Sequence, residues 1–157
     1  MSNFGDFQNG VYAEAVKGVT TRYPFDFASI EHKASEALPD WVYRYVSAAA
    51  GDGRTQRANI AAFSCYGIVP RMMVSPPARD LSIQLFGKHL ASPMFMAPIG
   101  LVGLCAPDFH GDVAAAQASA ATGVPFTLST FTQTRMEDVV KHTGKTPIFY
   151  QLYLPSD

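Results

Sequence analysis

The feature that most restricts the fold of this chain is an alternation of apolar strands and helical segments after Pro93. The expected order is strand, helix, strand, helix, strand, over residues 94–99, 112–121, 124–129, 136–142 and 148–154. The three strand segments are apolar on both faces, as parallel strands buried under helices are. The pattern therefore predicts an α/β fold with a parallel sheet that is covered by its connecting helices.

Two architectures share this pattern, an open doubly wound sheet and a (β/α)8 barrel. An open sheet that binds a dinucleotide would carry a GxGxxG motif directly after its first strand, and the stretch from Ala97 to Ala106 lacks that motif. A whole barrel takes about 250 residues, whereas 64 residues follow Pro93 (157 − 93). If the fold is a TIM barrel, this chain holds its N-terminal part, about three of the eight strands.

Residues 1–80 are expected to form an N-terminal arm followed by a helical cap. Residues 1–25 show no sustained period and are interpreted as an arm that lies on other surface. Asp26 is placed to cap a helix that runs to Leu38, and Asp40 is placed to cap the next one. A third helix begins near Thr55, and Gly67 is expected to end it.

Residues 81–92 are predicted to form a β-hairpin. Apolar residues alternate up to Leu85, and the turn is expected at residues 86–88, with a glycine in its first central position. The chain is thus divided into 1–80, 81–92 and 93–157, the last being the truncated first βαβαβ portion of a barrel.

Composition excludes several classes of function. Lysine and arginine total 12 against 13 acidic residues, and this balance gives no attraction for nucleic acid. The beginning of the sequence lacks the pattern of a signal or transit peptide, and no apolar run is long enough to span a membrane. We therefore expect a cytoplasmic protein that binds neither nucleic acid nor membrane. Two distant cysteines and four scattered histidines predict no metal site.

In a barrel, reactive groups gather at the C-terminal ends of the strands. The residues at these ends are Pro98-Ile99-Gly100, Ser129-Thr130-Phe131 and Gln151-Leu152-Tyr153, among which Gly100, Ser129, Gln151 and Tyr153 carry distinct chemical groups. A glycine lets a flat ligand approach the backbone, and serine and glutamine can bind the edge of a heterocycle. Each residue also has an ordinary alternative role, in a turn, a helix cap, a loop or the edge of the core. From the residues alone, the sequence supports a ligand-binding α/β segment.

Several motifs resemble, in order, those of the FMN-dependent 2-hydroxy-acid oxidases and dehydrogenases. They are Leu38-Pro-Asp-Trp-Val-Tyr-Arg-Tyr45 with Ala48-Ala-Ala-Gly-Asp52, Val69-Pro-Arg-Met72, Ala97-Pro-Ile-Gly100, Leu128-Ser-Thr130 and Phe149-Tyr-Gln-Leu-Tyr153. The opening residues 1–6, Thr55-Gln-Arg-Ala-Asn59 and His110-Gly-Asp112 are similar to the lactate 2-monooxygenase branch of this family.

The resemblance implies a barrel that holds FMN at its C-terminal mouth. By position, Pro98, Ile99 and Gly100 would lie against the flavin, and Ser129 and Gln151 would bind its pyrimidine edge. Tyr45 and Tyr153 would hold the substrate, a small (S)-2-hydroxy acid such as lactate, with oxygen as the acceptor. The complete protein is expected to be a homo-oligomer.

The resemblance also implies that the catalytic base lies beyond residue 157, because the family's lysine, its His-Gly-Gly-x-Arg motif and its phosphate loops come later than Asp157. No catalytic residue is therefore assigned in this chain, which is expected to be incomplete. Two alternatives stay open, a 2-hydroxy-acid oxidase that releases peroxide, and a non-catalytic fragment or pseudoenzyme.

Overall fold

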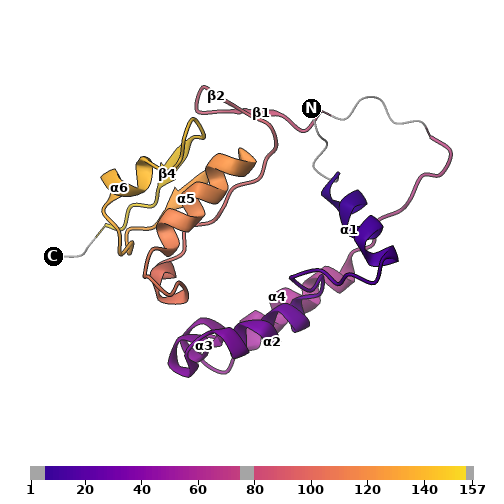
Figure 1. Cartoon of the computed structure of the whole chain (residues 1–157), viewed down its shortest axis with the longest axis horizontal. Helices are drawn as coiled ribbons and strands as arrows, with labels where there is room; N and C mark the ends of the chain where they lie inside the picture. The colour runs from indigo at the N-terminus through magenta and orange to yellow at the C-terminus, as the bar shows by residue number, and fades with distance from the viewer. Residues whose placement is uncertain (1–5, 75–79, 155–157) are drawn as a thin grey trace. The chain divides into compact units, whose positions relative to one another are not determined.

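The structure of the chain is a computed structural model that describes residues 6–74 and 80–154. Residues 1–5 of the expected arm and residues 75–79 of the expected cap lie outside the described part. The chain divides into two units, Met1–Arg54 and Thr55–Asp157. Figure 1 labels most of the helices and strands of both units along the chain.

The first unit consists of three helices, α1 (Phe7–Val16), α2 (Phe27–Ala37) and α3 (Asp40–Ser47). Within residues 1–25, the expected arm, α1 occupies the middle of the segment. The helix α1 buries no residue, and its sequence carries no apolar stripe that would have indicated a helix.

The start of α2 confirms the predicted cap. The side chain of Asp26 accepts a hydrogen bond from the backbone N–H of Ser29 at 2.8 Å. Asp40 is not a cap, since it is the first residue of α3, after Pro39 at the N-cap position. Its carboxylate instead pairs with Arg44 one turn later, at 2.8 Å. Only Val42 of α3 is buried.

The second unit begins with helices and a hairpin. α4 (Arg54–Ala62) continues into the 3-10 turn η1 (Phe63–Cys65), so the helical segment ends before Gly67, where its end was expected. The strands β1 (Ile83–Leu85) and β2 (Lys88–Leu90) form the predicted antiparallel hairpin, with Ile83 opposite Leu90.

The turn of the hairpin is shifted by one residue from the prediction. Its two central residues are Phe86 and Gly87, with φ of 49° and 70°, so glycine occupies the second position. Positive φ at both positions is the property of a type I′ turn. The ring of Phe86 packs against Phe149, with ring centroids 6.2 Å apart, and Phe95 packs on the same ring at 5.2 Å.

The second sheet of this unit, which follows the hairpin, is parallel, as predicted. β3 (Phe126–Leu128) pairs with β4 (Ile148–Tyr150), with Phe126 opposite Ile148. The expected first strand over 94–99 is reduced to one parallel bridge, between Met96 and Phe126. Pro98 explains the difference, because proline has no backbone N–H with which to continue the ladder.

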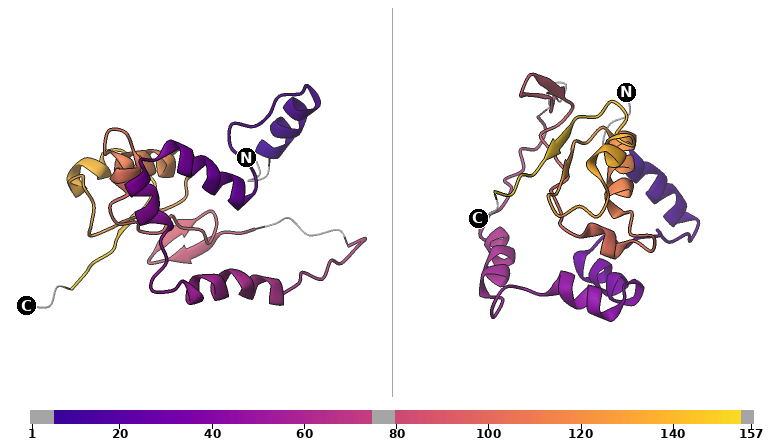
Figure 2. Two further views of the ribbon diagram at one scale, coloured as in Figure 1. Left: turned by 90° about the horizontal axis from the view of Figure 1, so that it is seen from below. Right: turned by 90° about the vertical axis from the view of Figure 1, so that its left-hand side faces the viewer.

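Two helices cover this sheet. α5 (Gly111–Thr122) follows the 3-10 turn η2 (Val102–Cys105) and lies beside β3, and the short helix α6 (Met136–Val140) connects β3 to β4 (Figures 1 and 2). The buried core consists of Ala116, Phe126, Leu128 and Val139, with Met96, Ala115 and Ile148 packed against it. This core fixes the position of the strand ends.

Candidate functional site

The ends of the three strand segments are joined by hydrogen bonds. The backbone N–H of Leu101 donates to the carbonyl of Phe131 at 3.0 Å, and that of Gln151 donates to the carbonyl of Leu128 at 2.9 Å. The residues that follow the Met96 bridge, β3 and β4 are therefore neighbours. This is the arrangement that the prediction of a site at the strand ends required.

Ser129 and Gln151 contact each other directly. Ser129 is 1% exposed, and its hydroxyl donates to Oε1 of Gln151 at 3.1 Å. The same oxygen of Ser129 accepts the backbone N–H of Phe131 at 3.1 Å. Because the carbonyl of the Gln151 amide is engaged, its NH2 group keeps two donors, and no described residue accepts from them.

Thr130 lies among the residues at the strand ends, and sequence reasoning gave it no role. Its hydroxyl donates to the backbone carbonyl of Gln151 and accepts the backbone N–H of Tyr153 at 3.1 Å. The side chain thus replaces the backbone of β3 in the ladder and holds residues 151–153 beside the loop after β3. The signal was available, because threonine follows Ser129 directly at the end of an apolar strand.

Gly100 lies against this loop. A Cβ atom placed on Gly100 would be 3.4 Å from Cβ of Phe131 and 3.7 Å from Oγ of Ser129. Gly100 is also absent from the glycines with positive φ, so its backbone does not require glycine. Because Gly100 has no side chain, the space next to the Ser129 hydroxyl stays free.

The remaining predicted residues of this unit surround the strand ends. Tyr153 is 43% exposed and meets the ring of Phe131 edge-on, with centroids 5.4 Å apart. Ile99 is 59% exposed and Pro98 is half-buried. Apolar surface therefore lies next to the polar groups of Ser129 and Gln151, as is usual for a site that binds a flat organic ligand.

Asp112 and Thr132 form a second polar contact that sequence reasoning did not place at the site. Asp112 is 1% exposed in the first turn of α5, and its Oδ2 atom accepts the hydroxyl of Thr132 at 2.9 Å. The same oxygen accepts the backbone N–H of Gln133 at 3.4 Å. Both donors belong to the loop that begins with Ser129.

Tyr45, the other predicted substrate residue, belongs to the first unit. It lies on α3, and 61% of its surface is exposed. Its role stays a prediction.

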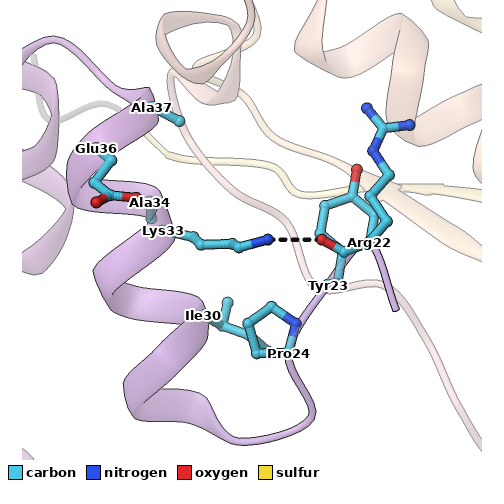
Figure 3. Close-up of a pocket in the computed structure, with 8 residues that line it drawn as sticks. All are labelled: Arg22, Tyr23, Pro24, Ile30, Lys33, Ala34, Glu36 and Ala37. Carbon is cyan, nitrogen blue, oxygen red and sulfur yellow. Dashed lines mark hydrogen bonds between the residues drawn. The ribbon is translucent and has the colours of Figure 1, made fainter. Parts of the chain in front are cut away.

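A cavity of about 660 Å³ lies in the first unit, between α2 and residues 22–24 (Figure 3). The ammonium group of Lys33 donates to the backbone carbonyl of Arg22 at 2.8 Å across one side of it. The cavity is lined by Arg22, Tyr23, Pro24, Ile30, Lys33, Ala34, Glu36 and Ala37. None of these residues belongs to the predicted site.

The shifted pKa values belong to exposed side chains away from the strand ends. The hydrogen bond from Lys141 lowers the pKa of Asp138, and the backbone N–H of His110 lowers that of Asp108. Over residues 6–74 and 80–154, no group of three side chains of the types that bind metal is found. Within the same ranges, no helix has the length and apolarity to cross a membrane.

The strand ends fit a flat heterocycle with alternating C=O and N–H groups along one edge. The two amide donors of Gln151 can bind carbonyl groups of that edge, and Gly100 leaves the adjacent space free of a side chain. Among the described residues, no histidine side chain makes a hydrogen bond to this network. The arrangement can therefore bind and orient a ligand.

Known proteins match most of the chain. The model of the family described as FMN-dependent dehydrogenase matches residues 34–157. An FMN-dependent alpha-hydroxy acid dehydrogenase of Penicillium citrinum is 32% identical over 99% of this chain and 38% of its own length. An L-lactate oxidase of Lysinibacillus sphaericus is 33% identical over 88% of this chain and 36% of its own length.

A solved structure has the same fold in the matched part. It is a soluble mutant of the (S)-mandelate dehydrogenase of Pseudomonas putida, with a TM-score of 0.70 and 31% identity. The match covers 79% of this chain and 35% of that protein. The chain therefore spans about a third of the length of the relatives that it matches.

Proposed function

This chain belongs to the family of FMN-dependent dehydrogenases, and on that basis we propose that it is the N-terminal part of a (β/α)8 barrel that oxidises a small 2-hydroxy acid with FMN. The coarse function follows from the family, whose relatives include an L-lactate oxidase and an alpha-hydroxy acid dehydrogenase. The barrel is supported by the parallel pairing of β3 and β4 and by the Met96 bridge.

The observation that carries the proposal is the contact between Ser129 and Gln151 beside Gly100. Ser129 fixes the carboxamide so that its NH2 group is available to the carbonyl groups of the flavin pyrimidine ring. Pro98, Ile99 and Gly100 would lie against the face of the ring. When FMN is bound, it supplies the acceptor for the hydride equivalent of the substrate α-carbon.

The residues of this chain bind and orient the reactants in this proposal. The hydroxyl of Tyr153 lies at the strand ends and would donate to the hydroxy acid, and Tyr45 would donate to its carboxylate. The exposed rings of Phe131 and Tyr153 would exclude water from the reacting carbon. The base that takes the hydroxyl proton would come from a later part of the whole protein.

We propose lactate as the substrate and oxygen as the acceptor. The similarity of residues 55–59 and 110–112 to the lactate 2-monooxygenase branch supports this choice. The relative from Lysinibacillus sphaericus, which is named an L-lactate oxidase, favours an oxidase that releases peroxide as the second candidate.

The test uses the complete product of the gene that encodes this segment. Purified protein should contain one FMN per chain, and anaerobic L-lactate should bleach its visible flavin spectrum. Product analysis in air then separates the two candidates, since a monooxygenase forms acetate and carbon dioxide whereas an oxidase forms pyruvate and peroxide. A complete product that contains no FMN, or that 2-hydroxy acids do not reduce, would refute the proposal.

A further inference from the structure

Asp112 is buried but contacts none of the predicted site residues. Its partners are the hydroxyl of Thr132 and the backbone N–H of Gln133, three and four residues after Ser129. A carboxylate is costly to bury unless it is fully hydrogen-bonded, so this side chain has a specific use in the fold. We propose that Asp112 is a positioning residue that holds the loop of residues 129–134 in the conformation that places Ser129 and Phe131 beside the flavin. This inference rests on the proposed function.

The loop is fixed from two sides, and the contacts on each side differ in kind. On the side of the strand ends, Ser129 and Thr130 bond to Gln151, and the carbonyl of Phe131 accepts from Leu101. On the opposite side, the described part of the chain offers Asp112 as the only carboxylate that accepts from the loop. Asp112 therefore connects α5 to the loop, whereas the other contacts connect it to neighbouring strand ends.

The packing around Asp112 leaves little room for another arrangement. A Cβ atom on Gly111 would be 2.5 Å from the carbonyl oxygen of Val102, and one on Gly103 would be 2.1 Å from Oε1 of Gln133. These distances are too short for real contacts, so both glycines allow η2, the start of α5 and the loop to approach one another closely. The turn before α5 thereby sets the position of the Asp112 carboxylate relative to Thr132.

The hydroxyl of Thr132 connects Asp112 to other residues of the loop. Its single proton has two acceptors within reach, Oδ2 of Asp112 at 2.9 Å and the carbonyl of Thr134 at 2.8 Å, and its oxygen accepts the backbone N–H of Thr134 at 3.1 Å. The backbone N–H of Thr132 donates to the carbonyl of Ser129 at 3.2 Å. A shift of Thr132 would therefore move the backbone of Ser129 and Phe131. The connection from Asp112 to the site therefore passes through Thr132 to Ser129.

The test measures FMN affinity in the complete gene product by titrating the apoprotein with FMN. We expect Asp112→Ala and Thr132→Val each to raise the FMN dissociation constant on the order of fivefold, because members of one hydrogen-bond network are energetically coupled. The double variant should be no weaker than either single one, and Thr132→Ser, which keeps the hydroxyl, should restore wild-type affinity. Asp108→Ala is the matched control, because Asp108 is exposed and its partner within residues 6–74 and 80–154 is His110, outside the loop of residues 129–134.

A purely structural role predicts a different result. Thermal unfolding would then fall for Asp112→Ala while the FMN dissociation constant, measured well below the unfolding temperature, stays at the wild-type value. That outcome, or additive effects in the double variant, would overturn the inference. If Asp112→Ala does not fold, the FMN dissociation constant of Thr132→Val decides between the two roles. Failure of the wild-type protein to bind FMN would instead refute the proposed function.

Discussion

The hydroxyl of Ser129 donates to Oε1 of Gln151 at 3.1 Å, and this contact joins the ends of two neighbouring parallel strands. It also determines the orientation of the carboxamide, because the oxygen faces Ser129 and the NH2 group faces away. A serine that is 1% exposed has little surface of its own to offer a ligand, so its proposed effect on FMN would come mainly through its neighbour.

Ser129→Ala tests this relationship in the complete gene product. The substitution leaves Oε1 of Gln151 and the backbone N–H of Phe131 without their partner. We expect the FMN dissociation constant to rise about tenfold, because a lost hydrogen bond costs on the order of 1.4 kcal/mol. Ser64→Ala is the control, since the Ser64 hydroxyl donates to the carbonyl of Ala61, away from the strand ends. Equal affinity of both variants for FMN would show that Ser129 does not orient Gln151 for the flavin.

Gly100→Ala should leave the protein folded and change its reaction with oxygen. The new methyl group would be in ordinary contact with Phe131 at 3.4 Å, and no positive φ strains it. It would occupy the space proposed for oxygen and for the keto acid, so reoxidation should change more than reduction by lactate, with pyruvate and peroxide replacing part of the acetate. Stopped-flow measurements of the two half-reactions, with product analysis, check this prediction.

Gly103→Ala is the matched control for Gly100→Ala. Its methyl group would lie 2.1 Å from Oε1 of Gln133 and 2.5 Å from the carbonyl oxygen of Phe109. We expect it to lower the free energy of unfolding by about 1–3 kcal/mol, the usual cost of overpacking. If Gly100→Ala also lowers stability and leaves both half-reactions unchanged, Gly100 serves the fold and not the flavin.

Tyr45→Phe should weaken substrate binding in the complete gene product. A hydrogen bond to a charged carboxylate contributes roughly 1.5–3 kcal/mol, so KM for lactate should rise by about tenfold or more, with a modest loss of kcat. FMN content should stay normal. Tyr43→Phe, on the same helix, is the control. An unchanged KM would remove Tyr45 from the site.

The 157-residue chain by itself should neither retain FMN nor oxidise lactate. Among the described residues, β4 pairs with β3 on one edge only, and the other edge has no strand beside it. The phosphate loops that the family resemblance implies come after residue 157. Gel filtration with excess FMN, followed by an absorption spectrum of the protein peak, checks this. A yellow protein with stoichiometric flavin would contradict it.

The cap of α2 should make part of the stability dependent on pH. The backbone N–H of Ser29 holds the pKa of Asp26 below its ordinary value of 3.8. A lowered pKa in the folded state means that the contribution is present above pH 3.8 and is lost as the pH falls through the folded-state value. Asp26→Asn keeps the cap without the charge, so its unfolding temperature should fall less than that of wild type between pH 5 and pH 3. Parallel curves for the two proteins would contradict this assignment.

Local signals predicted the parts of the fold that depend on them. Asp26 caps α2 as expected, and the apolar residues of β3 lie in the core. The strand expected over 94–99 is not formed as a ladder, because Pro98 lacks the backbone N–H that the ladder requires there. This requirement becomes apparent only when the pairing of the strands is known. The hairpin was found, but its turn was misplaced by one residue, since Phe86 adopts a positive φ that this residue type rarely has.

Residues at the strand ends could be chosen from the sequence, but their connections could not. Ser129 and Gln151 were chosen because they end apolar strands, and the structure places them in contact. Asp112 and Thr132 lie outside the strand ends and 20 positions apart, so no local pattern in the sequence indicated their contact. Periodicity describes the faces of single elements, whereas such contacts depend on how the elements are packed.

The packing of Phe86 on Phe149 also has a consequence for how the chain folds during synthesis. The two rings are 63 residues apart (149 − 86). At a translation rate of about 5–20 residues per second, the hairpin is synthesised roughly 3 to 13 seconds before its aromatic partner. Hairpins themselves form within microseconds, so β1 and β2 have time to pair before Phe149 is made. The ring of Phe86 is still 82% exposed in the folded structure, so chaperone binding to this ring should differ little between ribosome-bound chains that end before residue 149 and chains that extend well beyond it.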